Sequence, residues 1–116
     1  MRVRWNGVRV VITGRTPETV LVATRHERSA TLELLHVAVE ARGRGVGSAL
    51  LVTFARLCRD AGVRRIDADD VSDRARTRRN IYAKHGFVYR RDSGPEMYAN
   101  PRTVLETKEL DSFVRI

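Results

Sequence analysis

The segment 37–48, Val37-Ala38-Val39-Glu40-Ala41-Arg42-Gly43-Arg44-Gly45-Val46-Gly47-Ser48, joins two stretches of different hydrophobic period. Before it, residues 30–39 (ATLELLHVAV) are apolar at nearly every position, which is typical of a central strand covered on both faces. After it, apolar residues recur at the spacing of one helical face, and Gly62 stands as a C-terminal stop. The sequence therefore predicts a strand, a glycine-rich loop, and a helix from about Gly45 to Ala61.

The loop itself has the composition of a phosphate site. Its glycines leave amide N–H groups uncovered at the positive end of the helix, and Arg42 and Arg44 add charge. A Walker A loop is excluded because no lysine follows the last glycine, Gly47. The dinucleotide fingerprint fails as well, since its third glycine position holds Ser48.

The rest of the chain alternates between strand and helix patterns. Strands are predicted at 8–13, 19–25, 63–71, 87–90 and 103–110, and a second helix at about 74–85. Ser72 or Asp73 can cap this helix, and Gly86 ends it. The order predicts a hairpin followed by strand–helix–strand crossovers, hence an α/β fold with a mixed central sheet of about six strands flanked by helices.

Length and composition limit the alternatives. The 116 residues and 13.2 kDa fit a single domain over 1–116. No apolar stretch has the length of a membrane span or signal peptide, so a soluble, cytoplasmic protein without membrane contact is expected. One cysteine, Cys58, forms no internal disulfide, and the three histidines lie far apart, so no metal site is expected.

The net charge of +8, with a pI near 10.9, predicts attraction to polyanions. Two explanations compete, a nucleic-acid binder and a protein whose ligand carries several phosphates. Of the 22 basic residues 20 are arginine, so compositional habit explains part of the excess equally well. With 6% aromatic residues and no helix-turn-helix pattern, nucleic-acid binding is the less favoured reading.

Two motifs together resemble one family. Arg42-x-x-Gly45-x-Gly47 after an apolar strand resembles the R/Q-x-x-G-x-G/A pyrophosphate loop of the GCN5-related N-acetyltransferase (GNAT) family. Residues 82–87, Tyr-Ala-Lys-His-Gly-Phe, resemble its second signature, Y-x-K-x-G-F. The resemblance covers roughly residues 30–110. It implies a GNAT fold, acetyl-coenzyme A as co-substrate, and direct acetyl transfer to a primary amine, small molecule or protein, within a ternary complex.

The resemblance also implies roles for particular residues. The strand before the loop is expected to splay from its neighbour, so that backbone groups of Val37, Ala38 and Val39 pair with pantetheine. The pyrophosphate is then held by the seven loop residues Arg42, Gly43, Arg44, Gly45, Val46, Gly47 and Ser48. Lys84 reaches the ribose phosphate or is simply exposed. Tyr82 protonates the departing thiolate, or is a core residue with its hydroxyl at the edge.

Activation of the amine requires a proton acceptor. Glu33 and His36 are the polar exceptions on the apolar strand, and their odd separation predicts that they project to opposite faces. Glu33 is the first candidate, with a pKa raised by burial, although it can equally pair with an arginine. Asp69 and Asp70 on the next predicted strand are further candidates.

The chain also departs from the family pattern. Family members often carry Asn and Ala where this chain has Ala75 and Arg78, and the arginine cluster 74–79 has no counterpart. The two helices that usually follow the first strand are missing. We therefore expect an acceptor site that is open, completed by a second subunit in a homodimer, or suited to a large substrate. The alternative function is a degenerate member that binds coenzyme A or a protein partner and regulates without catalysis.

Overall fold

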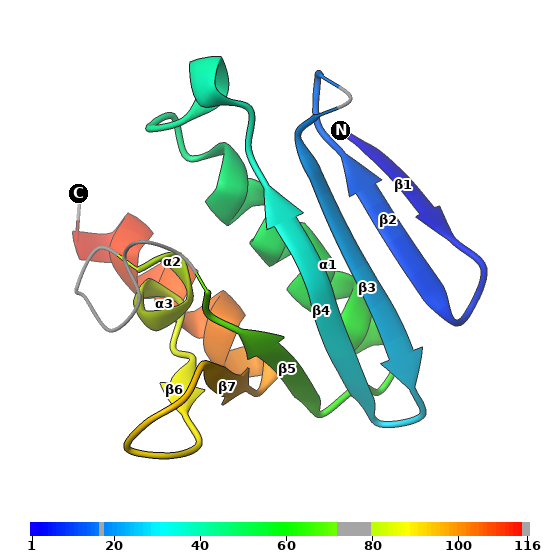
Figure 1. Cartoon of the computed structure of the whole chain (residues 1–116), viewed down its shortest axis with the longest axis vertical. Coiled ribbons are helices and arrows are strands. Elements are labelled where there is room, and N and C mark those ends of the chain that lie inside the picture. The colour runs from blue at the N-terminus through cyan, green and yellow to red at the C-terminus, as the bar shows by residue number, and fades with distance from the viewer. Residues whose placement is uncertain (17, 72–79, 115–116) are drawn as a thin grey trace.

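The computed structural model describes residues 1–16, 18–71 and 80–114, with the side chains of 108–114 excepted. Its strands are β1 (Arg2–Trp5), β2 (Arg9–Thr13), β3 (Val20–His26), β4 (Ser29–His36), β5 (Arg65–Asp69), β6 (Val88–Tyr89) and β7 (Glu96–Ala99). They form one sheet in the order β1-β2-β3-β4-β5-β7-β6, in which β4 and β5 are parallel and the other neighbours antiparallel (Figure 1). The helices are α1 (Val46–Asp60), α2 (Ile81–Lys84) and α3 (Pro101–Val114), with a 3₁₀ turn at Val39–Ala41.

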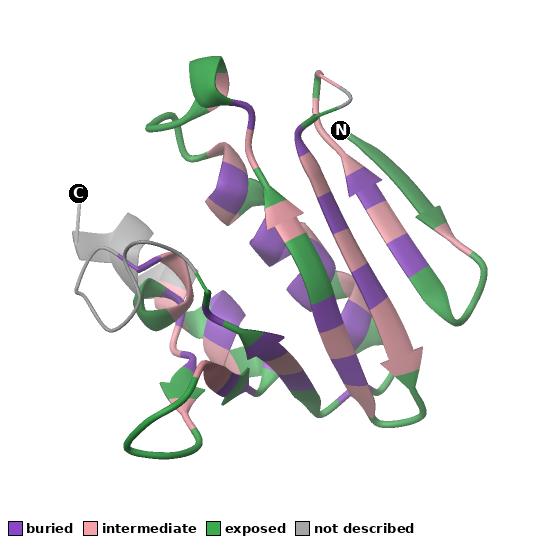
Figure 2. Cartoon of the chain, viewed as in Figure 1, coloured by how far each residue is buried: buried purple, intermediate pink, exposed green. Residues whose placement is uncertain are grey.

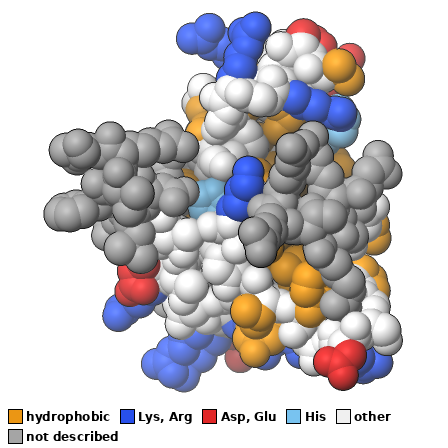
Figure 3. Space-filling view, turned by 90° about the vertical axis from the view of Figure 1, so that its left-hand side faces the viewer, with side chains coloured by type: hydrophobic (Ala, Val, Ile, Leu, Met, Phe, Trp, Pro, Cys, Tyr) orange, Lys and Arg blue, Asp and Glu red, His pale blue; other side chains and the backbone are white. Residues whose placement is uncertain are grey.

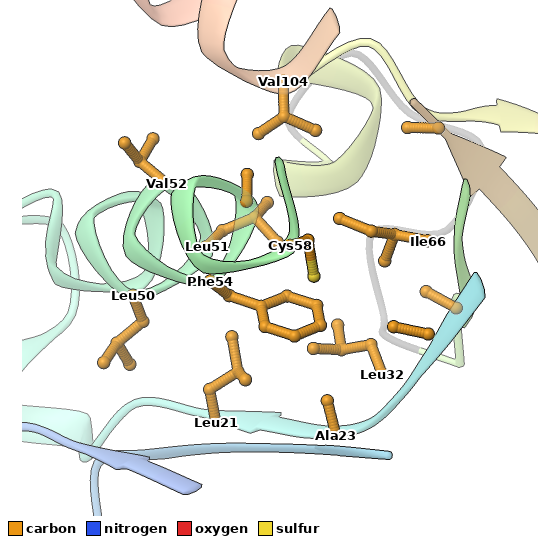
Figure 4. Packing of buried hydrophobic residues seen from close by; sticks show 14 of the residues in the cluster. Leu21, Ala23, Leu32, Leu50, Leu51, Val52, Phe54, Cys58, Ile66 and Val104 are labelled. Atoms are coloured by element: carbon orange, nitrogen blue, oxygen red, sulfur yellow. The ribbon is translucent and has the colours of Figure 1, made fainter. Parts of the chain in front are cut away.

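Helix α1 supplies the centre of the core. Its buried side chains include Leu50, Leu51, Phe54 and Cys58, which recur at helical spacing and so form one face. Figure 4 shows Phe54 pointing from α1 toward the strands, while Val104 of α3 points at α1 from another side. Burying each such large side chain contributes roughly 1.5–3 kcal/mol, so α1 is fixed against the sheet along its length.

The opposite face of the sheet is uncovered by any helix of the described residues (Figure 2). On β4 the side chain of Leu34 is 47% exposed, and its cross-strand partner Val22 is only half-buried. The prediction of a central strand covered on both faces is therefore wrong for β4. Its place in the middle of the sheet is confirmed, because three strands lie on each side of it.

The mixed α/β fold and the order of the central elements are confirmed, but the sheet has seven strands rather than about six. The additional strands are β1 and β7, which the sequence analysis did not predict. Strand β1 pairs with β2 across a turn at Asn6-Gly7, where Gly7 has a φ of 95° and the Asn6 side chain accepts N–H groups of Val8 and Arg9. An Asn-Gly pair is a strong hairpin signal, so β1 was detectable from the sequence.

The prediction of a last strand at 103–110 is wrong, because this segment lies in α3. The Asn100 side chain accepts the N–H of Arg102, and Pro101 occupies the first helical position, where its missing N–H costs nothing. Val104 and Leu105 are buried against the core that α1 organises. Packing against α1 thus outweighs the strand propensity of the β-branched residues.

The second predicted helix is described only at its end, as α2. Residues 72–79, including the predicted caps Ser72 and Asp73 and the cluster 74–79, lie outside the described residues. The Asn80 side chain caps α2 by accepting the N–H of Ala83 at 3.0 Å. Among the described helices, none is long and apolar enough to cross a membrane.

Candidate functional site

The two parallel strands separate at their carboxyl ends. Pairing between β4 and β5 stops at Leu32 and Ala68, whereas β4 continues to His36 without a β5 partner. The backbone of β4 beyond Leu32 therefore faces a gap in the hydrogen-bond ladder. Such a gap next to a strand–helix loop can take an extended ligand that pairs with the exposed strand edge.

The loop after β4 turns through two left-handed glycines, Gly43 with a φ of 79° and Gly45 with a φ of 77°. A Cβ added to either residue meets no atom within 4 Å, so open space lies beside the loop. Gly45 is the N-cap of α1 and offers no side chain to its N–H groups, and the first turn holds no acidic residue. The positive end of α1 is thus left for an anion.

Gly47 serves a different purpose from the two left-handed glycines. A Cβ there lies 3.0 Å from Ile81 Cδ1 and 3.3 Å from Val37 Cγ2, and the residue is buried. Without a side chain, Gly47 lets the first turn of α1 approach both the end of β4 and α2. Gly47 therefore allows the start of α1, the end of β4 and α2 to pack closely together.

The backbone beside the gap is partly engaged. Arg42 Nε donates to the Val37 carbonyl at 2.9 Å, and the Ala38 N–H donates to Thr19 Oγ1 at 3.0 Å. Val39 is 72% exposed, so the prediction that the stretch 30–39 is covered on both faces is wrong at this residue as well. The guanidinium of Arg42 thus braces the loop.

Arg44 is exposed and Figure 3 shows basic side chains at the upper end of the molecule, where Figure 1 places this loop. Lys84 is exposed in the last turn of α2, and Asp69 is exposed at the end of β5. Within the described part of the chain these three side chains form no ion pair or hydrogen bond, and all three are exposed to solvent.

Tyr82 lies on α2 with its ring packed edge-to-face against Phe87, the centroids 5.3 Å apart. Burial, with a smaller contribution from the nearby Asp70 carboxylate, raises the pKa of Tyr82 from 10.0 to about 12. Loss of water around the phenolate disfavours ionisation, so the hydroxyl is protonated throughout the neutral range. Its hydroxyl has no hydrogen-bond partner within the described part of the chain, and can therefore donate to a ligand.

Asp70, buried at the end of β5, organises the surroundings of Tyr82. Its Oδ2 accepts hydrogen bonds from Asn80 Nδ2 at 2.6 Å and from the Tyr89 hydroxyl at 2.7 Å, while its N–H donates to the Pro95 carbonyl. Asp70 thus holds Asn80 and Tyr89 in place, and its role as a proton acceptor stays a prediction. Sequence reasoning missed Asn80 and Tyr89, although a carboxylate after an alternating strand is a signal for such a cluster.

A hydrogen bond that the sequence did not predict joins helices α1 and α2. His85, buried at the end of α2, shares a hydrogen bond of 3.0 Å between its Nε2 and Ser48 Oγ in the first turn of α1. The Ser48 side chain is therefore directed to α2, and its backbone N–H stays available to a ligand of the loop. This contact fixes α2, and with it Tyr82, relative to the loop.

Glu33 is an extra residue in β4. Ala23 pairs with Leu32 and Val22 with Leu34, so the register shifts around Glu33 and forms a bulge. The bulge reverses the alternation, and His36, paired with Val20, lies on the same open face as Glu33. The prediction that the two project to opposite faces is wrong, because a bulge adds one residue to the period-two rule.

The carboxylate of Glu33 is not buried as expected, since 39% of its side chain is exposed. It accepts a hydrogen bond from Thr24 Oγ1 and forms an ion pair with Arg9 at 3.4 Å. The alternative of pairing with an arginine is thus what the structure shows. His36 is held through a hydrogen bond of 2.8 Å from its Nδ1 to the Glu18 carbonyl.

Comparison with known proteins gives one family. The model of the acetyltransferase (GNAT) domain matches residues 7–89, which is well over half of the chain. No curated protein matches the sequence.

Solved structures show the same fold. Ard1 from Thermoplasma volcanium is 25% identical over 83% of this chain and 72% of its own, with a TM-score of 0.63. GCN5 from Tetrahymena is 15% identical over 79% of this chain and 66% of its own, with a TM-score of 0.55. The anti-CRISPR protein AcrVA5 is 18% identical over 78% of this chain and 98% of its own, with a TM-score of 0.59.

Proposed function

Because this chain belongs to the GNAT acetyltransferase family, we propose that it transfers the acetyl group of acetyl-coenzyme A directly to a primary amine within a ternary complex. The observation that carries the proposal is the coincidence of an uncapped, glycine-lined helix start with the separation of β4 from β5. One end of the sheet thereby offers a diphosphate site beside an open strand edge.

The diphosphate would be bound mainly by the peptide N–H groups of 43–48. Gly43 and Gly45 leave space on the ligand side, and the dipole of the fifteen-residue α1 adds a favourable partial charge worth roughly 0.3–1 kcal/mol. Arg44 can add a charge-assisted hydrogen bond. Arg42 contributes by bracing Val37, and Lys84 remains a candidate for the ribose phosphate.

Pantetheine would extend along β4 past the last β4–β5 pair. The N–H groups of Val37 and Val39 donate to no acceptor within the described residues, and the Val37 carbonyl can accept a second hydrogen bond beside that from Arg42. The Ala38 N–H is already bound to Thr19. Val37 and Val39 therefore carry this role, and Ala38 only lies between them.

Tyr82 would donate a proton, or a hydrogen bond, to the thiolate of the departing coenzyme A. Since the pKa of Tyr82 is raised to about 12 and that of an ordinary thiol is about 8.5, complete proton transfer is uphill. A hydrogen bond to the developing negative charge still lowers the barrier. The contacts of Asp70 and His85 at either side of α2 hold Tyr82 in place for this purpose.

Glu33 would accept the proton of the attacking amine, directly or through water. It lies on the open face, one residue beyond the last β4–β5 pair, so an acceptor that approaches from this face meets its carboxylate near the gap. Arg9 and Thr24 fix the carboxylate without enclosing it. The open face leaves room for a large acceptor such as a peptide.

The test is release of free thiol from acetyl-coenzyme A in the presence of a panel of amines: peptide N-termini, lysine peptides and small amines. We expect amine-dependent release by the wild type and loss of it in Tyr82→Phe. The single cysteine, Cys58, is buried and so does not disturb the thiol readout. A protein that binds acetyl-coenzyme A but releases no thiol with any amine would be the non-catalytic regulator instead.

A further inference from the structure

A hollow of about 820 Å³ lies at the end of the molecule away from the glycine loop. It is lined by the end of β3 and its turn to β4, the C-terminal end of α1, the segment that leads from α1 to β5, and the start of α3. Five of its lining residues are arginines: Arg25, Arg28, Arg59, Arg64 and Arg102. We call it the arginine hollow.

The arginine hollow is separate from the proposed coenzyme site. The loop precedes α1, whereas Ala61, Gly62 and Val63 in the hollow follow it. With 15 residues and a rise of about 1.5 Å each, α1 separates the two regions by roughly 20 Å. Figure 1 accordingly shows the loop at the upper end of the sheet and the β3–β4 turn at the lower end.

Two of the five guanidinium groups are engaged within the fold. Arg25 donates from Nε to the Glu27 carbonyl at 3.1 Å and from Nη2 to the Ala61 carbonyl at 3.0 Å, and so satisfies the end of α1. Arg59 pairs with Asp60 at 3.1 Å. These contacts fix part of the wall and neutralise only part of its charge.

The other three, Arg28, Arg64 and Arg102, are exposed, and the structure shows no ion pair for their side chains among the described residues. Their backbone is nevertheless well anchored, since the N–H of Arg64 donates to the Arg28 carbonyl at 2.7 Å. The one acidic side chain in the wall is that of Glu27. Among the described residues, the wall of this open hollow therefore carries more positive than negative charge.

We propose that the arginine hollow binds a small anion that carries two or more linked phosphate groups. Planar guanidinium groups match phosphate oxygens in paired hydrogen bonds, and several of them in one hollow favour a compact, multiply charged ligand over a single charge. The volume lies within the range of small-ligand sites. The described residues of the wall include no aromatic side chain. The hollow therefore offers contacts to phosphate oxygens and no surface on which a nucleic-acid base could stack.

The test is calorimetric titration of the full chain with inorganic tripolyphosphate. The hollow variant carries Arg28→Gln, Arg64→Gln and Arg102→Gln, and the matched control carries Arg2→Gln, Arg4→Gln and Arg56→Gln, which removes the same charge from exposed positions elsewhere. We expect the hollow variant to bind roughly tenfold or more weakly, because charge-assisted contacts are lost, and the control to stay within about twofold. Circular dichroism verifies that both variants are folded.

All titrations are made with coenzyme A at saturation, so that the loop of the proposed function is occupied and tripolyphosphate reports on the arginine hollow alone. Equal weakening in both variants would mean general attraction to a basic protein and would overturn the proposal, as would absence of tripolyphosphate binding to the wild type under these conditions. The last titration uses an unstructured single-stranded oligonucleotide in place of tripolyphosphate. If it binds through the same three arginines while tripolyphosphate does not, the hollow is a nucleic-acid surface and the proposal is wrong.

Discussion

Burial acts on Tyr82 and Cys58 in the same direction, since each side chain loses the water that would stabilise its anion. The consequences differ because Tyr82 lies beside the candidate site, whereas Cys58 faces the core from α1. For Tyr82 the result is a hydroxyl that remains a donor. For Cys58 the result is an inert thiol.

Tyr82→Phe should lower kcat by about 10²–10³, the usual cost of removing one hydrogen-bond donor to a developing negative charge, and leave the affinity for acetyl-coenzyme A within about twofold. Phenylalanine retains the ring that packs against Phe87, so the fold should persist. Steady-state kinetics and calorimetry measure the two quantities. Since the pKa of Tyr82 is about 12, the wild type should show no alkaline loss of kcat from this group below pH 10. Unchanged kcat in the variant would remove Tyr82 from the chemistry.

Cys58 should react very slowly with an aromatic disulfide reagent. Burial raises the pKa of its thiol from 9.0 to about 12, which at pH 8 lowers the thiolate fraction about a thousandfold, and access is restricted further. The reaction rate in native buffer and in urea gives the comparison. Because the folded pKa lies above the unfolded value, ionisation favours the unfolded chain and stability should fall as pH rises from about 9 toward 12. Equal reaction rates in buffer and urea would contradict a buried Cys58.

At the scale of elements, α1 has a left-handed glycine at each end. Gly45 and Gly62 have φ values of 77° and 81°, and an added Cβ meets nothing within 4 Å at either position. Alanine therefore creates no steric overlap at these sites, only the backbone cost of roughly 1–2 kcal/mol. The two positions are matched in structure and differ in their distance from the proposed diphosphate.

Gly45→Ala and Gly62→Ala should thus destabilise the fold by similar amounts, and only Gly45→Ala should weaken acetyl-coenzyme A binding, because it shifts the amides of the loop. Urea unfolding and calorimetry measure the two effects. Equal affinity in the two variants would argue against a role of the loop in binding.

The extent of sequence prediction also varies by element. Helix α1 was predicted at 45–61 and lies at Val46–Asp60, because its apolar stripe and flanking glycines agree. The bulge at Glu33 was not predictable, since nothing in an apolar run marks where the register shifts. The segment of α3 was predicted as a strand because Thr103 and Val104 favour one locally, whereas the Asn100 cap, Pro101 at the first helical position and packing on α1 favour the helix.

In the candidate site, too, some features were predictable from the sequence and others were not. Its loop was readable from glycine spacing, because positive φ values demand glycine at Gly43 and Gly45. The contacts that hold α2 were not readable, since Ser48 and His85 lie 37 residues apart in sequence and meet only in the fold. Spacing predicts backbone conformation, whereas long-range polar pairs depend on the assembled sheet.

For the molecule as a whole, the sheet face that packs against α1 supplies most of the stability. The opposite face is the one we propose for the approach of the amine acceptor. Phe54→Ala should lower the free energy of unfolding by about 3–5 kcal/mol, because Phe54 is fully buried between α1 and the strands. Arg56→Ala, exposed on the same helix, is the control and should stay within about 0.5 kcal/mol. Urea denaturation measures both, and a loss below about 1 kcal/mol in Phe54→Ala would contradict this core.

The most direct measurement is the change in backbone amide NMR shifts on addition of coenzyme A, with pantetheine, which lacks the diphosphate, as the comparison. If the amides of 43–48 grip the diphosphate, coenzyme A should shift them strongly while pantetheine leaves them nearly unchanged and affects Val37 and Val39. Shifts confined to other regions, with the amides of 43–48 unmoved by saturating coenzyme A, would contradict the account.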